Sequence, residues 1–181
     1  MREPWETSKH EWLLWIDDDI LITNPEKGLN TLITKYGEKK HLIIAGDAWK
    51  HKNVPINSGI FLINNSPWAR SFLKRVWHEG GLRGYVKRGQ SLLEQQTMTD
   101  LIRENLTDRS KVQILPLGNQ LQSFFRSDHY DDPESTKWKP GDFAAHLTGI
   151  PNTLRVNLVN ELINQGDIPQ RKPDINKLGS K

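Results

Sequence analysis

The chain has 181 residues, of which 35% are hydrophobic and 26% are charged, enough for one globular domain with a real core. Its formal net charge of +3 is too small to indicate a nucleic-acid-binding protein. It contains no cysteine, which excludes disulfides and leaves any metal to oxygen and imidazole ligands. No apolar stretch approaches the roughly 20 residues of a transmembrane helix, so no membrane segment is expected in the chain.

The first predicted elements are a strand and a helix. Residues 11–16 (EWLLWI) form a short apolar run that predicts a buried strand. The following helix is expected to have Asn24 as its N-cap and Pro25 as its first residue, and to end at Gly37. Its apolar face would consist of Leu29, Leu32, Ile33 and Tyr36.

The rest of the chain alternates between predicted strands and helices. Further strands are predicted at residues 41–47, 59–64, 112–116, 120–125 and 143–147. Helices are predicted from Ser66–Pro67 onward, at 91–105 and at 153–165. The buried sides of the first two would carry Trp68, Phe72, Val76 and Trp77, and Leu93, Met98, Leu101 and Ile102. This order predicts an α/β fold with a mixed, largely parallel sheet, with one domain at 1–165 and a polar tail at 166–181.

Three consecutive aspartates, Asp17, Asp18 and Asp19, follow the first predicted strand. On an extended backbone Asp17 and Asp19 would share a face while Asp18 points elsewhere. Two carboxylates on one side suit Mn²⁺ or Mg²⁺, which would offset their repulsion and could hold a diphosphate. The alternative is that the aspartates cap the next turn and helix. With a metal site, Asp19→Asn is expected to abolish Mn²⁺ binding and leave the thermal midpoint similar or higher.

Two further polar groups stand at the ends of apolar runs. His146 follows a predicted strand, and a neutral imidazole is a common third ligand beside carboxylates, although a structural role is the alternative. Glu94, Gln95 and Gln96 open an otherwise apolar helix, where a solvated first turn is the alternative.

Four segments in order carry a resemblance to a known family: HEWLLWIDDDILITNP, INSGIFLINNSPWARSFL, LEQQTMTDLI and HLTG. They resemble the galactosyl/xylosyl/mannosyltransferase family of the GMA12/MNN10 type, glycosyltransferase family 34. Its members are retaining glycosyltransferases with the GT-A fold. The resemblance extends over about residues 11–149, most of the chain.

The resemblance implies a role for each matching residue. The metal ligands would be Asp17, Asp19 and His146, holding Mn²⁺ (or Mg²⁺) against the donor diphosphate. Asp18, Gly149 and Arg155 would also lie on the donor side. Gln96 would lie near the anomeric carbon, with Gln95 and Glu94 where the family usually has carboxylates. The acceptor side would consist of Asp47, Asn57, Ser58 and Gly59.

The chain also departs from the family pattern. Only sixteen residues precede Asp17, so the N-terminal nucleotide-binding half of the family is expected to be lacking. Gln95 replaces a carboxylate, and a lysine expected after the His-x-x-Gly motif is missing, with Arg155 the nearest cation.

The expected activity is retaining transfer of a hexose or pentose from a nucleotide sugar to an oligosaccharide, polysaccharide or glycoprotein glycan. Two alternatives remain open. One is a non-catalytic remnant that binds a sugar or sugar nucleotide. The other is a haloacid-dehalogenase-like phosphatase, because Asp17-x-Asp19 after a strand fits its opening, although Leu21 stands where that class has a small or hydroxyl residue. Family members reside in the Golgi membrane, with a lumenal domain, if eukaryotic; a bacterial protein would be cytoplasmic.

Overall fold

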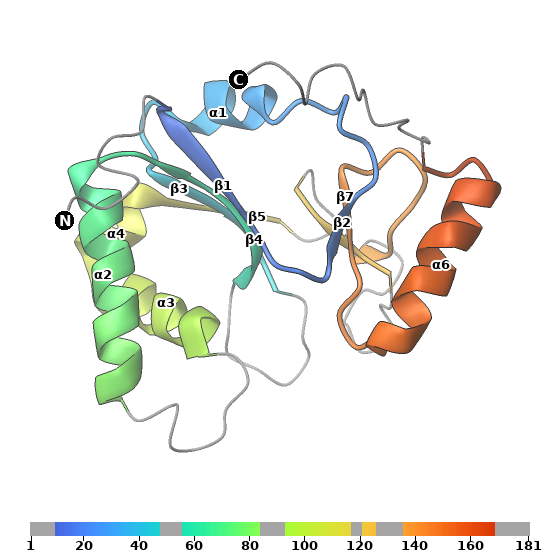
Figure 1. Cartoon of the computed structure of the whole chain (residues 1–181). Coiled ribbons are helices and arrows are strands. Elements are labelled where there is room, and N and C mark those ends of the chain that lie inside the picture. Colours follow the sequence, from blue (N-terminus) through green and yellow to red (C-terminus); the bar gives the residue numbers. More distant parts are fainter. Residues whose placement is uncertain (1–9, 48–55, 84–92, 117–120, 126–135, 169–181) are drawn as a thin grey trace, which may run out of the picture.

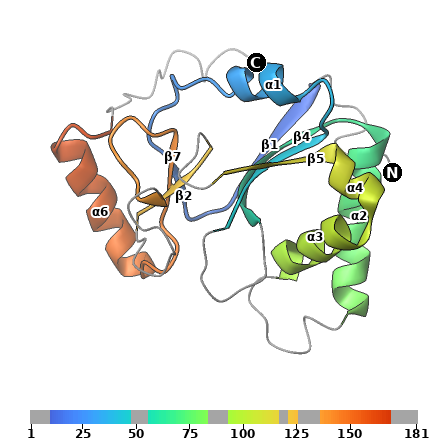
Figure 2. The same ribbon diagram turned by 180° about the vertical axis from the view of Figure 1, so that it is seen from behind.

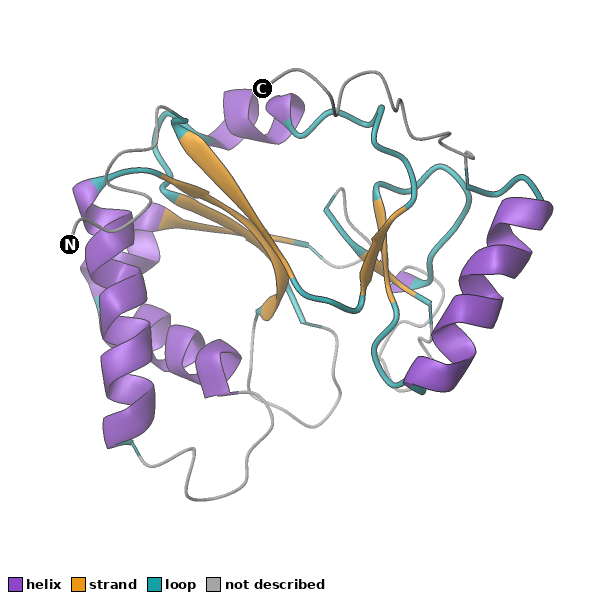
Figure 3. Cartoon of the chain, in the orientation of Figure 1, coloured by secondary structure: helices purple, strands orange, loops and turns teal. Residues whose placement is uncertain are grey.

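The computed structural model describes residues 10–47, 56–83, 93–116, 121–125 and 136–168, which form two β-sheets with helices on their outer sides (Figure 1). The strands are β1 (Trp12–Ile16), β2 (Ile20–Ile22), β3 (Leu42–Ala45), β4 (Asn57–Asn64), β5 (Val112–Leu115), β6 (Ser123–Phe124) and β7 (Ala144–His146). The helices are α1 (Asn30–Tyr36), α2 (Pro67–Leu82), α3 (Leu93–Glu104), α4 (Leu106–Lys111) and α6 (Asn152–Asn164). Figure 3 shows the two classes of element in separate colours.

Both sheets contain parallel and antiparallel strands. The first has the order β1-β4-β3-β5, in which β4 is antiparallel to both neighbours and β3 is parallel to β5. The second has the order β2-β7-β6, with β2 antiparallel and β6 parallel to β7. The mixed α/β class is confirmed, but the predicted predominance of parallel pairing is wrong. Three of the five strand pairs among the described residues are antiparallel, β1 with β4, β3 with β4 and β2 with β7.

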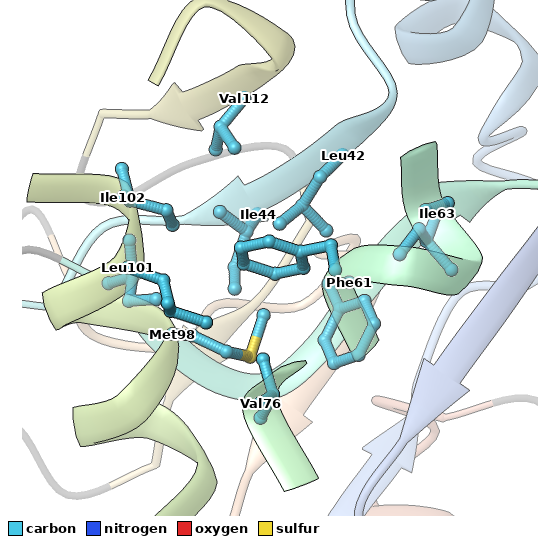
Figure 4. Close-up of a cluster of buried hydrophobic side chains, with 12 residues drawn as sticks. Leu42, Ile44, Phe61, Ile63, Val76, Met98, Leu101, Ile102 and Val112 are labelled. Carbon is cyan, nitrogen blue, oxygen red and sulfur yellow. The ribbon is translucent and has the colours of Figure 1, made fainter. Parts of the chain in front are cut away.

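The main core lies between the first sheet and helices α2 and α3 (Figure 4). Leu42, Ile44 and Phe61 point from the sheet toward Val76 and Met98 on the helices (Figure 4). A second cluster covers the other face of the same sheet, where α1 packs, and a third lies between β7 and α6. Seen from behind, α6 stands at the opposite end of the molecule from α2 (Figure 2).

Strand β1 is less buried than the sequence predicts. It lies at the edge of its sheet, and its one strand neighbour among the described residues is β4. Leu14, Trp15 and Ile16 are 38%, 52% and 40% exposed, respectively. The apolar run correctly predicted a strand. Because an edge strand has a neighbour on one side only, its side chains are less covered than those of a central strand.

Helix α1 begins five residues later than predicted. Asn24 does not cap it: the Asn24 amide donates to the Gly141 carbonyl at 3.1 Å, and the Asn24 backbone N–H donates to Phe143 at 3.1 Å. These bonds tie the segment after β2 to the chain entering β7. The predicted end at Gly37 is confirmed, since its N–H closes the last turn on Ile33.

The predicted start of α2 is confirmed, but the predicted burial of one of its residues, Trp77, is wrong. Ser66 accepts a hydrogen bond from the Ala69 N–H at 3.2 Å, with Pro67 in the first turn. Phe72 and Val76 are buried, whereas Trp77 is 88% exposed. Val76 takes the inward position in that turn, so the adjacent Trp77 points to solvent.

Two elements were not predicted, β2 directly after the aspartates and the short α4, whose N-cap Asn105 accepts from the N–H groups of Thr107 and Asp108. The predicted polar tail lies mostly outside the described residues, although Ile168 is buried against α6. Within the described part of the chain, every helix is too short or too polar to cross a bilayer.

Candidate functional site

The aspartates lie in the turn that carries the chain from the first sheet to the second. The Asp17 N–H donates to the Gly59 carbonyl of β4 at 2.8 Å, and the Asp19 carbonyl accepts from the Leu147 N–H at 2.9 Å. Within the turn, the Ile20 N–H donates to the Asp17 carbonyl at 3.2 Å. The predicted extended backbone is therefore wrong at this point. The aspartates also do not cap α1, which begins well beyond them.

Asp19 lies beside two cationic or potentially cationic groups. His146 Nε2 is 3.2 Å from Asp19 Oδ1, and the Arg155 guanidinium is 3.5 Å from Asp19 Oδ2. Pairing of β2 with β7 sets this arrangement, because Ile20 is directly opposite His146. The hydrogen bond from His146 lowers the pKa of Asp19 and outweighs the opposing effect of burial. Three residues singled out from the sequence thus come together.

Asp17 has different surroundings. The Trp15 indole N–H donates to Asp17 Oδ1 at 2.8 Å. Burial raises the pKa of Asp17, and the charges of Glu94 and Asp19 add to the rise. Trp15 is a site residue that the sequence did not indicate, since an aromatic two residues earlier in a strand is ordinarily part of the core. The middle aspartate, Asp18, is exposed.

The predicted three-ligand metal centre is not complete in this arrangement. Asp19 and His146 converge, but no three His, Asp or Glu side chains of the described residues are placed to hold one ion. The donor chemistry still suits a small divalent ion, because carboxylate oxygen and imidazole nitrogen are ligands that Mn²⁺ accepts.

Gly59 leaves the space in which the His146 ring lies. A Cβ at position 59 would come within 2.7 Å of His146 Cε1 and 3.2 Å of Nδ1. The same ring also stacks on Phe124, at 5.4 Å between centroids. Gly59 was expected on the acceptor side, and here it also sets the position of the imidazole.

Gln95 joins the start of α3 to the ends of two strands. Its Oε1 accepts from the Ser58 N–H at 2.9 Å, and its Nε2 donates to Asp47 at 3.1 Å. The Ser58 hydroxyl donates to Glu94 at 2.9 Å. The Gln95 side chain is almost fully buried. It uses its oxygen and its nitrogen to hold two residues of the expected acceptor side, which explains an amide where a carboxylate was expected.

Gln96 belongs to a separate network. Its amide donates to Asp100 at 3.1 Å, and Asp100 pairs with Arg103 at 2.8 Å and with Arg83 at 3.5 Å. The structure therefore does not bring Gln96 into contact with Asp19 or His146 through any interaction among the described residues.

Asn57 is held by a residue that the sequence did not single out. Asn57 Oδ1 accepts from the Gly59 N–H and from Gln122 Nε2, both at 3.0 Å. Gln122 is buried, and its side chain links the segment before β6 to β4. The signal was available in the predicted strand QLQSFF, where the polar Gln122 follows the apolar Leu121. Gly149, expected on the donor side, lies in an exposed turn with φ of 73°, a conformation that favours glycine.

Gln95→Glu is expected to destabilise the fold by about 2–4 kcal/mol, because a buried carboxylate would then face Asp47 without the donated hydrogen bond. Chemical denaturation at neutral pH measures the loss. Asp47→Asn in the same chain should recover much of it, since the new amide can donate to Glu at position 95. A double variant no more stable than Gln95→Glu alone would show that the Asp47 contact is unimportant.

The fold is that of the GT-A glycosyltransferases. A solved glycosyltransferase involved in glycosylation of the major capsid of PBCV-1 superimposes with a TM-score of 0.59 at 20% identity, over 86% of this chain and 69% of that one. The glycosyltransferase GlyE of Streptococcus pneumoniae TIGR4 gives 0.51 at 14% identity, over 94% of this chain and 47% of that one. The chain therefore spans less than half of the length of GlyE.

The chain belongs to the galactosyl transferase GMA12/MNN10 family, whose model matches residues 34–154. This match includes Gln95 and His146 and begins after the three aspartates. No curated protein matches the sequence. Membership of a glycosyltransferase family decides against the haloacid-dehalogenase-like alternative.

Proposed function

We propose that the domain takes part in metal-dependent, retaining transfer of a hexose or pentose from a nucleotide sugar to a glycan. The contact of Asp19 with His146 at 3.2 Å is the observation that carries this proposal. It joins two motifs of the family resemblance that are far apart in the sequence, at the junction of the two sheets.

Asp19, His146 and Asp17 are the proposed donors to Mn²⁺. When bound, the ion would neutralise the diphosphate that leaves the sugar. Arg155 supports this side of the site, because its guanidinium already lies 3.5 Å from Asp19 and can contact a phosphate oxygen. It would supply the cation that the missing lysine supplies elsewhere in the family.

The acceptor side is proposed along Asp47, Asn57 and Ser58, which Gln95 and Gln122 hold in place. These residues offer amide, hydroxyl and carboxylate groups, which suit a hydroxyl-rich glycan. Glu94 connects the two sides, because it accepts from Ser58 and its charge raises the pKa of Asp17. A polar environment of this kind suits a retaining displacement, which needs groups around the reacting carbon more than a strong base.

Turnover of a nucleotide sugar with and without Mn²⁺ tests the proposal. We expect UDP-sugar hydrolysis to require added Mn²⁺ or Mg²⁺ and to stop when the metal is chelated. Calorimetry with UDP and Mn²⁺ runs in parallel. Metal-dependent UDP binding without any hydrolysis or transfer would favour the non-catalytic remnant, for which the buried amide of Gln95 is the supporting observation. If the chain shows neither UDP binding nor turnover, both the enzyme and the non-catalytic remnant are contradicted.

A further inference from the structure

The outer face of helix α2 combines basic side chains with exposed apolar side chains. Arg70, Lys74 and His78 are spaced four residues apart and so lie on one side of the helix. Trp77 and Leu82 flank them and are 88% and 72% exposed. The inner face packs against the rest of the protein, since Ala69, Phe72, Val76 and Gly80 are buried.

Among the described residues, no carboxylate forms an ion pair with Arg70 or Lys74 on this face. Glu79 is the one acidic residue of α2, and it pairs with Arg83 at 2.9 Å. Arg75 is satisfied by Asp108 at 2.7 Å, and Arg70 donates to Asn65 at 2.9 Å. Lys74 is exposed, and no ion pair is found for it within the part of the chain described.

The cations also surround a shallow depression. An open hollow of about 590 Å³ is lined by Pro67, Arg70, Ser71, Lys74, Arg75 and His78. Arg75 is held by Asp108, but the Arg70 guanidinium, the Lys74 ammonium and the Ser71 hydroxyl also line the hollow and can donate to phosphate oxygens. Trp77 and Leu82 lie beside it, and their exposed tips have no core to enter.

We propose that this face of α2 binds the surface of an anionic phospholipid membrane. Lipid phosphates would lie in the hollow, while Trp77 and Leu82 would insert at the level of the headgroups, where amphipathic rings are favoured. A helix face that mixes basic groups with exposed apolar side chains suits the surface of an anionic membrane. The proposal is independent of the proposed catalytic site, because no residue of this face belongs to it.

Vesicle sedimentation tests this surface. The full chain is mixed with phosphatidylcholine vesicles that contain phosphatidylserine, and with vesicles of phosphatidylcholine alone. Binding should be at least about tenfold tighter to the anionic vesicles and should weaken with salt. Lys74→Glu should weaken it by about tenfold or more, since one basic residue near the surface contributes roughly fivefold in affinity and the substitution also adds a repelling charge. Trp77→Ser should weaken it by about tenfold as well.

Two matched substitutions control for charge and apolarity. Lys39→Glu reverses an exposed lysine next to α1, and Val156→Ser removes an exposed apolar residue of α6, which is 66% exposed at the far end of the molecule (Figure 1). Both should bind like the unmodified chain. Equal binding to neutral vesicles, or equal losses in Lys39→Glu and Lys74→Glu, would overturn the proposal. So would binding to heparin that depends on Lys74 while anionic vesicles stay unbound, because the partner would then be a soluble polyanion.

Discussion

Asp19→Asn is expected to lower nucleotide-sugar turnover at least about 100-fold, the loss typical of removing one preorganised electrostatic contact at a reacting centre. The carboxylate is the group that lies between His146 and Arg155, and an amide cannot provide its charge. The measurement is kcat with saturating Mn²⁺, together with the Kd of UDP in the presence of the ion. Glu38→Gln is the control, because that carboxylate is exposed after α1 and has no assigned role in the site.

The same substitution should lower stability, contrary to the expectation from the sequence that removing a repelling charge would leave it similar or higher. The pKa of Asp19 is lowered in the fold, so its carboxylate stabilises the native state. This contribution is fully present above the unfolded pKa and is lost as the pH falls through the folded pKa. The variant should therefore be less stable at neutral pH by about 1–2 kcal/mol, and the difference should shrink in acid.

Asp17→Asn should have the opposite effect on stability. The pKa of Asp17 is raised, mainly by burial, so its charged form is disfavoured in the fold at neutral pH. An amide oxygen can still accept from the Trp15 indole, and we expect an equal or higher free energy of unfolding. Equal pH profiles for Asp17→Asn and Asp19→Asn in urea denaturation would contradict the assignment of these two carboxylates to different electrostatic surroundings.

Gly59→Ala is the second change with a large expected effect. The new Cβ would lie 2.7 Å from His146 Cε1, closer than two carbon atoms can approach, and 3.1 Å from Asn57 Oδ1, a tight contact. The His146 ring is buried and stacks on Phe124, which restricts how far it can move. Overpacking of this kind costs about 1–3 kcal/mol, and it should also displace His146 from Asp19.

Thermal unfolding and Mn²⁺ titration of Gly59→Ala measure the two consequences separately. We expect a lower Tm and a metal affinity reduced by about tenfold or more, because a displaced ligand binds poorly. Gly28→Ala is the control, since its Cβ would meet no atom within 4 Å. A Gly59→Ala chain with normal metal affinity would show that His146 does not need this space.

Most strands and helices could be predicted from local pattern alone. Short apolar runs located β3, β4 and β5, and Ser66 with Pro67 located the start of α2. The direction of pairing could not be predicted, because the choice between parallel and antiparallel depends on how the chain returns between strands. The predicted burial of Trp77 failed for a related reason: neighbours on a helix compete for the inward position, and Val76 holds it.

The main polar residues of the candidate site could be predicted from the sequence, but the residues that hold them in place could not. Asp19 and His146 stand out because polar side chains end apolar runs at these positions, and the structure brings the two residues together. Gln122 and Trp15 support Asn57 and Asp17 from elements whose partners become known only in the folded chain. The position of Gln95 was noted, but its burial and its bonds to Ser58 and Asp47 come from the packing of α3 against β4.

The turn that carries the aspartates bonds to both sheets, through Gly59 on one side and Leu147 on the other. A ligand that binds only the folded chain at this turn would therefore stabilise the arrangement of both sheets through linkage. When the ligand leaves, the backbone and the hydrogen bonds to Gly59 and Leu147 still join the sheets, and only the contribution of binding is lost. Occupancy of the site and stability of the fold are thus linked equilibria in this domain.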